Sequence, residues 1–219
     1  MILHSAGLTT EGRAIAIAGP KGAGKTTLLL QLLASGRARY LCNDRLAVDP
    51  ISGRARAVPT IVAIRDGTRQ LAPGLAAALN RAGDFRLNDR ERAAMTSPPA
   101  SRAGVWHFSP AQVAAATSCK MDVEAPLSAV VVITGTGERT APTPIPASDA
   151  ARVLAEHTIG ARSSCYTSEV FSPPATPVGA ERIRARCEQL AHRVRMFAIH
   201  AGEPLRAGEA AALIDAIVS

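Results

Sequence analysis

A chain of 219 residues, 47% of them hydrophobic, is long enough for one packed α/β domain. The net charge of +7 is carried mostly by arginines scattered along the chain without interleaved aromatic residues, which argues against a specific nucleic-acid surface. The four cysteines form no C-x-x-C pair, which argues against a zinc site or a disulfide framework. No apolar stretch reaches membrane-spanning length and no signal peptide opens the chain, so a cytoplasmic protein without a membrane partner is expected.

The most informative segment is a glycine-rich loop between an apolar strand and an apolar helix. Residues 14–18 predict a buried strand, and residues 27–34 predict a helix that ends near Gly36. Between them residues 19–26 read GPKGAGKT, which matches the phosphate-binding pattern G-x-x-x-x-G-K-[ST] in its required strand–loop–helix context. The predicted nucleotide-binding residues are Gly19, Pro20, Lys21, Gly22, Ala23, Gly24, Lys25, Thr26 and Thr27.

Each part of this pattern has a chemical reason. Small residues let backbone N–H groups close around phosphate oxygens, and the helix start adds its positive dipole end. Lys25 is expected to reach the β- and γ-phosphates, and the Thr26 hydroxyl is expected to hold Mg²⁺. No N-K-x-D guanine-reading motif occurs, so ATP is favoured over GTP. The predicted cofactors are therefore ATP and Mg²⁺.

The rest of the chain alternates strands and helices. After Arg39–Cys42, a predicted strand, residues 46–49 and 55–58 form a hairpin, and residues 61–65 form a strand that stops at Asp66-Gly67. Residues 71–80 are weakly helical, and residues 81–102 are a polar, proline-bearing insertion expected to be mobile. Further predicted elements are a strand over 128–134, a helix over 148–157 with Ser148 as N-cap, a helix over 180–193, a strand over 194–199 and a helix over 208–218.

A second group of candidate residues follows the strand after the loop's helix. Neighbouring parallel strands deliver their ends to one edge of a sheet, which places Asp44 near the phosphate loop. A carboxylate there can order Mg²⁺ together with Thr26, or accept the proton of an attacking hydroxyl. The alternative is that Asp44 only caps a turn.

In this order, His4, the GPKGAGKT loop, Asn43-Asp44 and the segment 61–65 resemble the HPr kinase/phosphorylase family. The chain is also similar to small kinases related to that family, some of which phosphorylate a serine of lasso-peptide precursors. Segments 126–134, 150–157 and 194–200 extend the likeness over nearly the whole chain. The resemblance implies an α/β fold with a P-loop NTPase-type sheet flanked by helices, as in the HPr kinase C-terminal domain. It implies that residues 1–219 are a single minimal catalytic domain, and family relatives often form homo-oligomers.

The resemblance also implies roles and exposes two departures. His4 is placed near the transferred phosphoryl group, although a solvated terminal histidine is the alternative. The family has two adjacent aspartates where this chain has Asn43 and Asp44. An amide cannot take a proton, so a base role falls to Asp44, or it moves to His4 or to a residue not yet identified. The family's glutamate before the Ile-Arg pair is Ala63 here. Arg65 is retained, either to stabilise charge on the γ-phosphate or an acidic substrate, or as a surface ion pair.

The predicted function is an ATP-dependent kinase that transfers the γ-phosphoryl group to a hydroxyl, expected to be a serine, of a peptide or small protein. The predicted catalytic residues are Asp44, Lys25, Arg65 and His4. The arginines of segment 81–102 either grip an acidic acceptor or belong to a charged loop. A nucleotide-hydrolysing switch without an acceptor is the alternative favoured by Asn43 and Ala63, and a kinase for free serine or a metabolite remains open.

Overall fold

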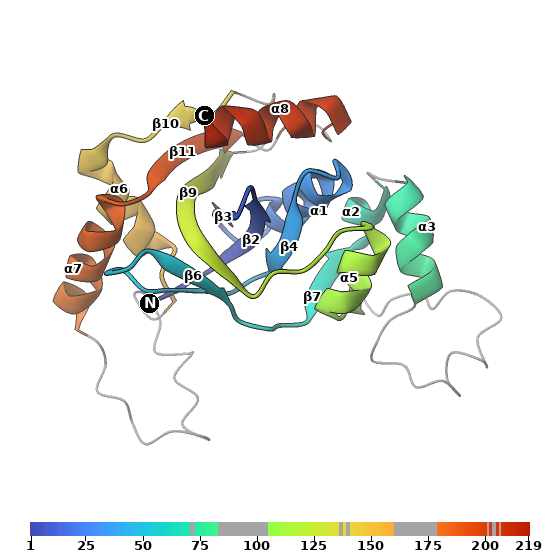
Figure 1. Ribbon diagram of the computed structural model, residues 1–219, viewed down its shortest axis with the longest axis horizontal. Coiled ribbons are helices and arrows are strands. Elements are labelled where there is room, and N and C mark those ends of the chain that lie inside the picture. The colour runs from blue at the N-terminus through green and yellow to red at the C-terminus, as the bar shows by residue number, and fades with distance from the viewer. Residues whose placement is uncertain are drawn as a thin grey trace, which may run out of the picture.

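The computed structural model describes residues 1–70, 73–82, 105–135, 138, 141–159, 179–200, 202, 205 and 207–219. These residues form a mixed α/β fold around a large central sheet with helices on both faces (Figure 1). Apart from Arg81 and Ala82, the predicted insertion 81–102 lies outside the described residues. No helix in the described part combines the length and apolar character needed to cross a membrane.

Two parallel strands, β3 (Arg13–Ala18) and β9 (Glu124–Gly135), form the middle of the sheet. Their apolar residues are buried on both faces, which explains why both strands read as continuous hydrophobic runs in the sequence. Ile15 and Ile17 pack into the core on one face, whereas the alternating Ala14, Ala16 and Ala18 pack into the core on the other face. The sheet therefore separates two hydrophobic cores.

The other strands extend this pair to both sides. The order is β1-β5-β6-β9-β3-β2-β4, and β11 also pairs with β9 in parallel and carries β10 on its outer edge. A separate two-stranded sheet consists of β7 and β8. The strand bounds are Ile2–Leu3 (β1), Ser5–Thr10 (β2), Arg39–Cys42 (β4), Leu46–Val48 (β5), Arg54–Ala57 (β6), Val62–Arg65 (β7), Val105–Phe108 (β8), Thr143–Pro144 (β10) and Arg195–His200 (β11).

The helices divide between the two faces. Leucines of α1 and aliphatic residues of α8 belong to one core, and residues of α6 and α7 belong to the other. In Figure 1, α8 lies near α1 at one side of the sheet, while α6 and α7 stand together at the other. The helix bounds are Lys25–Ala34 (α1), Asp66–Gln70 (α2), Pro73–Ala82 (α3), Pro110–Ala116 (α5), Ala147–Glu156 (α6), Ala180–Ala191 (α7) and Ala207–Val218 (α8).

The strand predicted over residues 61–65 ends at Arg65 as expected, and Asp66 begins α2. Three other sequence-based expectations need correction. Strand β2 lies between β3 and β4, so β4 is not the direct neighbour of the loop strand. Ser148 is not an N-cap, because α6 starts at Ala147 behind extended Pro146 and has no side-chain cap. The segment 105–116, for which no element was predicted, forms β8 and α5.

Candidate functional site

The glycine loop connects the end of β3 to the start of α1. Gly19 has φ 150° and Gly24, the N-cap of α1, has φ 97°, both in a range that other residues rarely adopt. A Cβ on Gly19 would lie 3.0 Å from the carbonyl oxygen of Ile133, so the loop also approaches β9 too closely for a side chain. The glycine pattern read in the sequence thus has a direct conformational cause.

The first turn of α1 faces a cavity. Lys25, Thr26 and Thr27 line it, and the N-cap glycine supplies no side-chain cap. The first N–H groups of a helix have no intrahelical partner, and the first turn of α1 contains no acidic residue to balance its dipole. This end of the cavity is therefore suited to an anion.

The Lys25 ammonium group is turned back onto its own loop. Its Nζ donates to the carbonyl oxygens of Gly19 at 2.7 Å and Pro20 at 3.0 Å. Burial lowers the pKa of Lys25 below its ordinary value, and the nearby Asp44 carboxylate partly opposes that shift. Lys25 is thus a partly desolvated cation beside the loop and its helix.

His4 and Asp44 meet at the opposite wall, across strand pairs that fix their register. Strand β2 pairs with β4 through Gly7 and Cys42, and β1 pairs with β5 through Leu3 and Leu46. His4 connects β1 to β2, and Asp44 lies in the connection between β4 and β5. Because β1 pairs with β5 and β2 pairs with β4, these two connections lie next to each other and the two residues face each other. His4 Nε2 lies 3.0 Å from Asp44 Oδ1.

The Asp44 carboxylate is held in its ionised form. The hydrogen bond from His4 is the largest cause that lowers the pKa of Asp44; burial opposes it, and the charges of His4, Arg45 and Lys25 lower the pKa further. The Asp44 backbone has φ 81°, a left-handed conformation that Asp tolerates better than most residues. With 46% of the side chain exposed, the carboxylate is accessible from the cavity.

Asn43 joins the two walls. The Thr26 hydroxyl donates to Asn43 Oδ1 at 3.0 Å, and the Thr60 hydroxyl donates to the Asn43 carbonyl oxygen. Asn43 is only 6% exposed. Sequence analysis identified Asn43 as a departure from a family pattern but did not predict it as the partner of Thr26. That contact depends on how the end of β4 meets α1, which local sequence does not specify.

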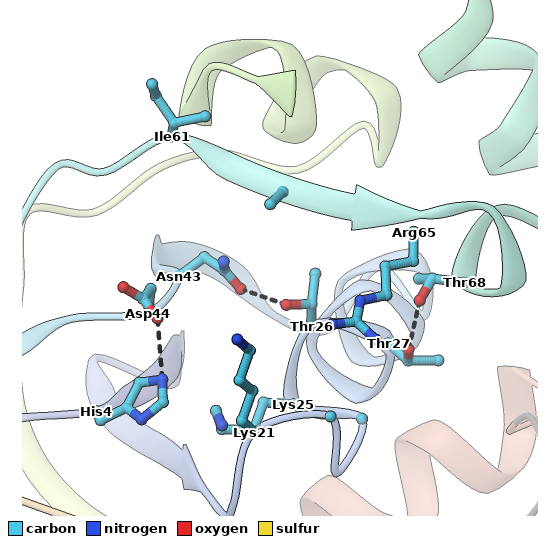
Figure 2. Close-up of a pocket in the computed structure, with 13 residues that line it drawn as sticks. His4, Lys21, Lys25, Thr26, Thr27, Asn43, Asp44, Ile61, Arg65 and Thr68 are labelled. Atoms are coloured by element: carbon cyan, nitrogen blue, oxygen red, sulfur yellow. Dashed lines mark hydrogen bonds and ion pairs between the residues drawn. The ribbon is translucent and has the colours of Figure 1, made fainter. Parts of the chain in front are cut away.

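Strand β7 covers the cavity from above in Figure 2. Val62 and Ile64 are buried in the core, and the alternation of a strand leaves Ile61, Ala63 and Arg65 to line the cavity. Arg65 forms no ion pair with any other residue that the structure describes. At the end of this segment, Thr68 Oγ1 lies 2.8 Å from Thr27 Oγ1.

The resulting cavity measures about 360 Å³ and gathers most of the predicted site residues. Of the predicted set, Gly19, Pro20 and Ala23 do not line it: the first two hold Lys25 through their carbonyls, and Ala23 is packed into the core. The lining residues missed by the sequence are Asn43, Ile61, Ala63 and Thr68, the first two of them at strand ends. All lining residues are His4, Lys21, Gly22, Gly24, Lys25, Thr26, Thr27, Asn43, Asp44, Ile61, Ala63, Arg65 and Thr68.

The chemistry of the lining fits an anion bound together with a hard cation. Lys21, Lys25 and Arg65 carry positive charge, against the single carboxylate of Asp44. Hydroxyl, amide and carboxylate oxygens of Thr26, Asn43 and Asp44 are ligands of the type that Mg²⁺ prefers. In the described part of the chain no cluster of three His, Cys, Asp or Glu side chains forms a metal cage. A cation at this site would need additional oxygens from a ligand or water.

Comparison with known proteins gives a distant likeness among solved structures. No family model matches the chain, and no curated protein matches it. Among solved structures, the chain is similar to the HPr(Ser) kinase/phosphatase from Coxiella burnetii, with 12% sequence identity and a TM-score of 0.33. The similarity covers 62% of this chain and 66% of that chain, just under two thirds of its length.

Proposed function

We propose that this protein is an ATP-dependent phosphotransferase that moves the γ-phosphoryl group of Mg²⁺-bound ATP to a hydroxyl group. One observation carries the proposal: a single cavity has Lys25 and Thr26 on one wall and the His4–Asp44 pair on the other. The first pair is suited to a triphosphate tail, and the second is suited to a hydroxyl that loses its proton. Two such groups facing one space are the minimum that phosphoryl transfer requires.

At the phosphate end, the α1 amides and the Lys25 ammonium group would hold the β- and γ-phosphates. Thr26, with Asn43 and Asp44 beside it, would hold Mg²⁺, which when bound neutralises charge on the phosphate oxygens. Lys25 already donates to two loop carbonyls, so it is oriented along the loop before a nucleotide arrives. A volume of about 360 Å³ is sufficient for the polyphosphate part of a nucleotide.

At the acceptor end, Asp44 would accept the proton of the attacking hydroxyl. The acceptor O–H bond breaks, a new P–O bond forms, the bond from the γ-phosphorus to the bridging oxygen breaks, and ADP leaves. His4 holds the carboxylate ionised and oriented by its hydrogen bond. Arg65, on the wall above the loop, would neutralise charge on the transferred group. Asn43 cannot take the proton, and Asp44 is the only carboxylate among the described lining residues. The role of proton acceptor is therefore proposed for Asp44.

The acceptor is proposed to be a serine of a peptide or small protein, because the family resembled in sequence acts on such serines. The same resemblance supports treating residues 1–219 as a single catalytic domain. Ile61 is half exposed at the cavity wall and Ala63 lies beside it, so this wall offers an apolar surface to the group that carries the hydroxyl.

Incubation with γ-labelled ATP, Mg²⁺ and candidate hydroxyl acceptors tests the proposal. Label on an acceptor is expected with the natural chain. The Asp44→Asn variant should retain nucleotide binding and lose most transfer, about a hundredfold or more if it acts as general base. Asp149→Asn changes an exposed carboxylate on α6 and is the matched control. Transfer by Asp44→Asn at the natural rate would refute the assigned role.

A nucleotide-hydrolysing switch is the second candidate, and the Asn43 side chain favours it. Its amide oxygen accepts from Thr26 where a second carboxylate would otherwise stand. The labelling experiment separates the two, because a switch releases free phosphate and labels no acceptor. A kinase for free serine or a metabolite would label the small molecule in place of the peptide.

A further inference from the structure

The hydroxyl groups of Thr27 and Thr68 form a contact that links the phosphate loop's helix to the segment above the cavity. Their Oγ1 atoms lie 2.8 Å apart, although 41 positions separate them in the chain. Both residues line the cavity. Thr27 belongs to the first turn of α1, and Thr68 belongs to α2, directly after the strand that carries Arg65.

The direction of this hydrogen bond matters for anion binding. A hydroxyl has one proton and two acceptor lone pairs. When Thr68 donates to Thr27, the Thr27 hydroxyl proton remains available for a hydrogen bond to an anion in the cavity. When Thr27 donates to Thr68, the Thr27 proton is already used in that hydrogen bond. An anionic ligand at the first turn of α1 favours the first arrangement, since it needs a donor.

Thr68 is held in place from its own side. Trp106 of β8 donates to the Asp66 carboxylate at the start of α2, at 2.7 Å. At the other end of the covering strand, Thr60 donates to the carbonyl of Asn43. The segment from Thr60 to Thr68 is therefore hydrogen-bonded to Asn43 at one end and to Thr27 at the other. Of the hydrogen bonds of Thr60 and Thr68, that of Thr68 lies nearer in sequence to Arg65.

We infer that Thr68 is a positioning residue of the nucleotide site: its hydroxyl donates to Thr27, directs the Thr27 proton at a phosphate oxygen and holds the Arg65 end of β7 above the loop. The inference rests on the proposed nucleotide binding. It assigns Thr68 no direct role in the transfer step.

The test compares Mg²⁺·ATP affinity of the natural chain with Thr68→Val, Thr68→Ser, Thr27→Ala and Thr27→Ala/Thr68→Val, by calorimetric titration. Thr68→Val keeps the shape and removes the hydroxyl, and should weaken binding about three- to tenfold, the effect of one lost hydrogen bond. Thr68→Ser should bind like the natural chain. In the double variant, Thr68→Val should add no further loss to that of Thr27→Ala. Thr143→Val, on β10, is the matched Thr→Val control and should change nothing.

Thermal unfolding of each variant without nucleotide shows that it folds. If Thr68→Val binds like the natural chain, or if its effect multiplies with that of Thr27→Ala, the inference fails while nucleotide binding stands. If the natural chain itself binds no Mg²⁺·ATP, the proposed function and the inference fail together. Rescue by Thr68→Ser supports the role of the hydroxyl, and loss in Thr68→Ser equal to that in Thr68→Val overturns it.

Discussion

The imidazole of His4 lies 3.0 Å from the carboxylate of Asp44, although 40 positions of sequence separate the two residues. Two antiparallel strand pairings on either side of them, β1 with β5 and β2 with β4, bring them together. Neither residue belongs to a strand, and both side chains line the cavity. Their contact ties the N-terminal segment to the chemistry proposed for the site.

Removing the imidazole should change how Asp44 titrates. The folded-state pKa of Asp44 lies below its ordinary value of 3.8, mainly because of the His4 hydrogen bond. In His4→Ala this cause is absent while burial still acts, so the pKa of Asp44 should rise. Asp44 contributes stability above its ordinary pKa and loses it as the pH falls through the lowered folded pKa. The contribution of Asp44 to the free energy of unfolding should therefore be smaller in His4→Ala than in the natural chain.

Carboxyl-carbon NMR across the acid range measures the Asp44 titration directly. His192→Ala, which changes an exposed histidine at the end of α7, is the control and should leave the Asp44 titration unchanged. An unchanged Asp44 pKa in His4→Ala would show that the contact does not set its ionisation.

The substitution Asn43→Asp tests the amide that accepts from Thr26. Asn43 is 6% exposed, so a carboxylate there is poorly solvated and should lower the free energy of unfolding by about 1–3 kcal/mol in the absence of Mg²⁺. An added oxygen charge beside Thr26 and Asp44 should strengthen Mg²⁺ binding. Thermal unfolding with EDTA and with Mg²⁺ checks both effects: the variant should recover stability with Mg²⁺. A loss that Mg²⁺ does not reverse would place the cation elsewhere.

The loop backbone should not tolerate a side chain at Gly19. Its φ is 150°, and a Cβ there would stand 3.0 Å from the carbonyl oxygen of Ile133, so Gly19→Ala should cost about 1–3 kcal/mol of stability. It should also weaken nucleotide binding, because the Gly19 carbonyl holds Lys25. Gly208→Ala, in the open on α8, is the matched control and should be neutral or slightly stabilising. Denaturant unfolding of Gly19→Ala and Gly208→Ala measures the difference. Equal free energies of unfolding for the two variants would contradict the predicted cost at Gly19.

The sequence was sufficient for features that depend on neighbouring residues. The strand–loop–helix around Lys25 is local, and the hydrophobic run of β9 is long and β-branched, so both were predicted and found. The hairpin β5–β6 was also predicted from its turn residues and is confirmed. Helix α5, in contrast, was missed although Ser109 and Gln112 form a capping box that the sequence displays.

Features that depend on distant pairing were not predictable in the same way. Asp44 was expected at the loop's edge because β4 was taken as the parallel neighbour of β3, but β2 lies between them. Asp44 nevertheless lies at the same edge of the sheet as the loop, because β3 and β4 both run antiparallel to β2 and so end at that edge. The contacts of Asn43 with Thr26 and of Thr68 with Thr27 join residues 17 and 41 positions apart, and no local pattern marks them.

The most direct test of the central claim is a calorimetric titration of Mg²⁺·ATP into the natural chain and into Lys25→Met. Lys120→Met, which removes an exposed lysine at a distance from the cavity, is the control. The natural chain and the control should bind with the same affinity, and Lys25→Met should bind at least about tenfold more weakly, because a charged hydrogen-bond donor is lost. No measurable binding to the natural chain, or equal binding to Lys25→Met, would contradict the account.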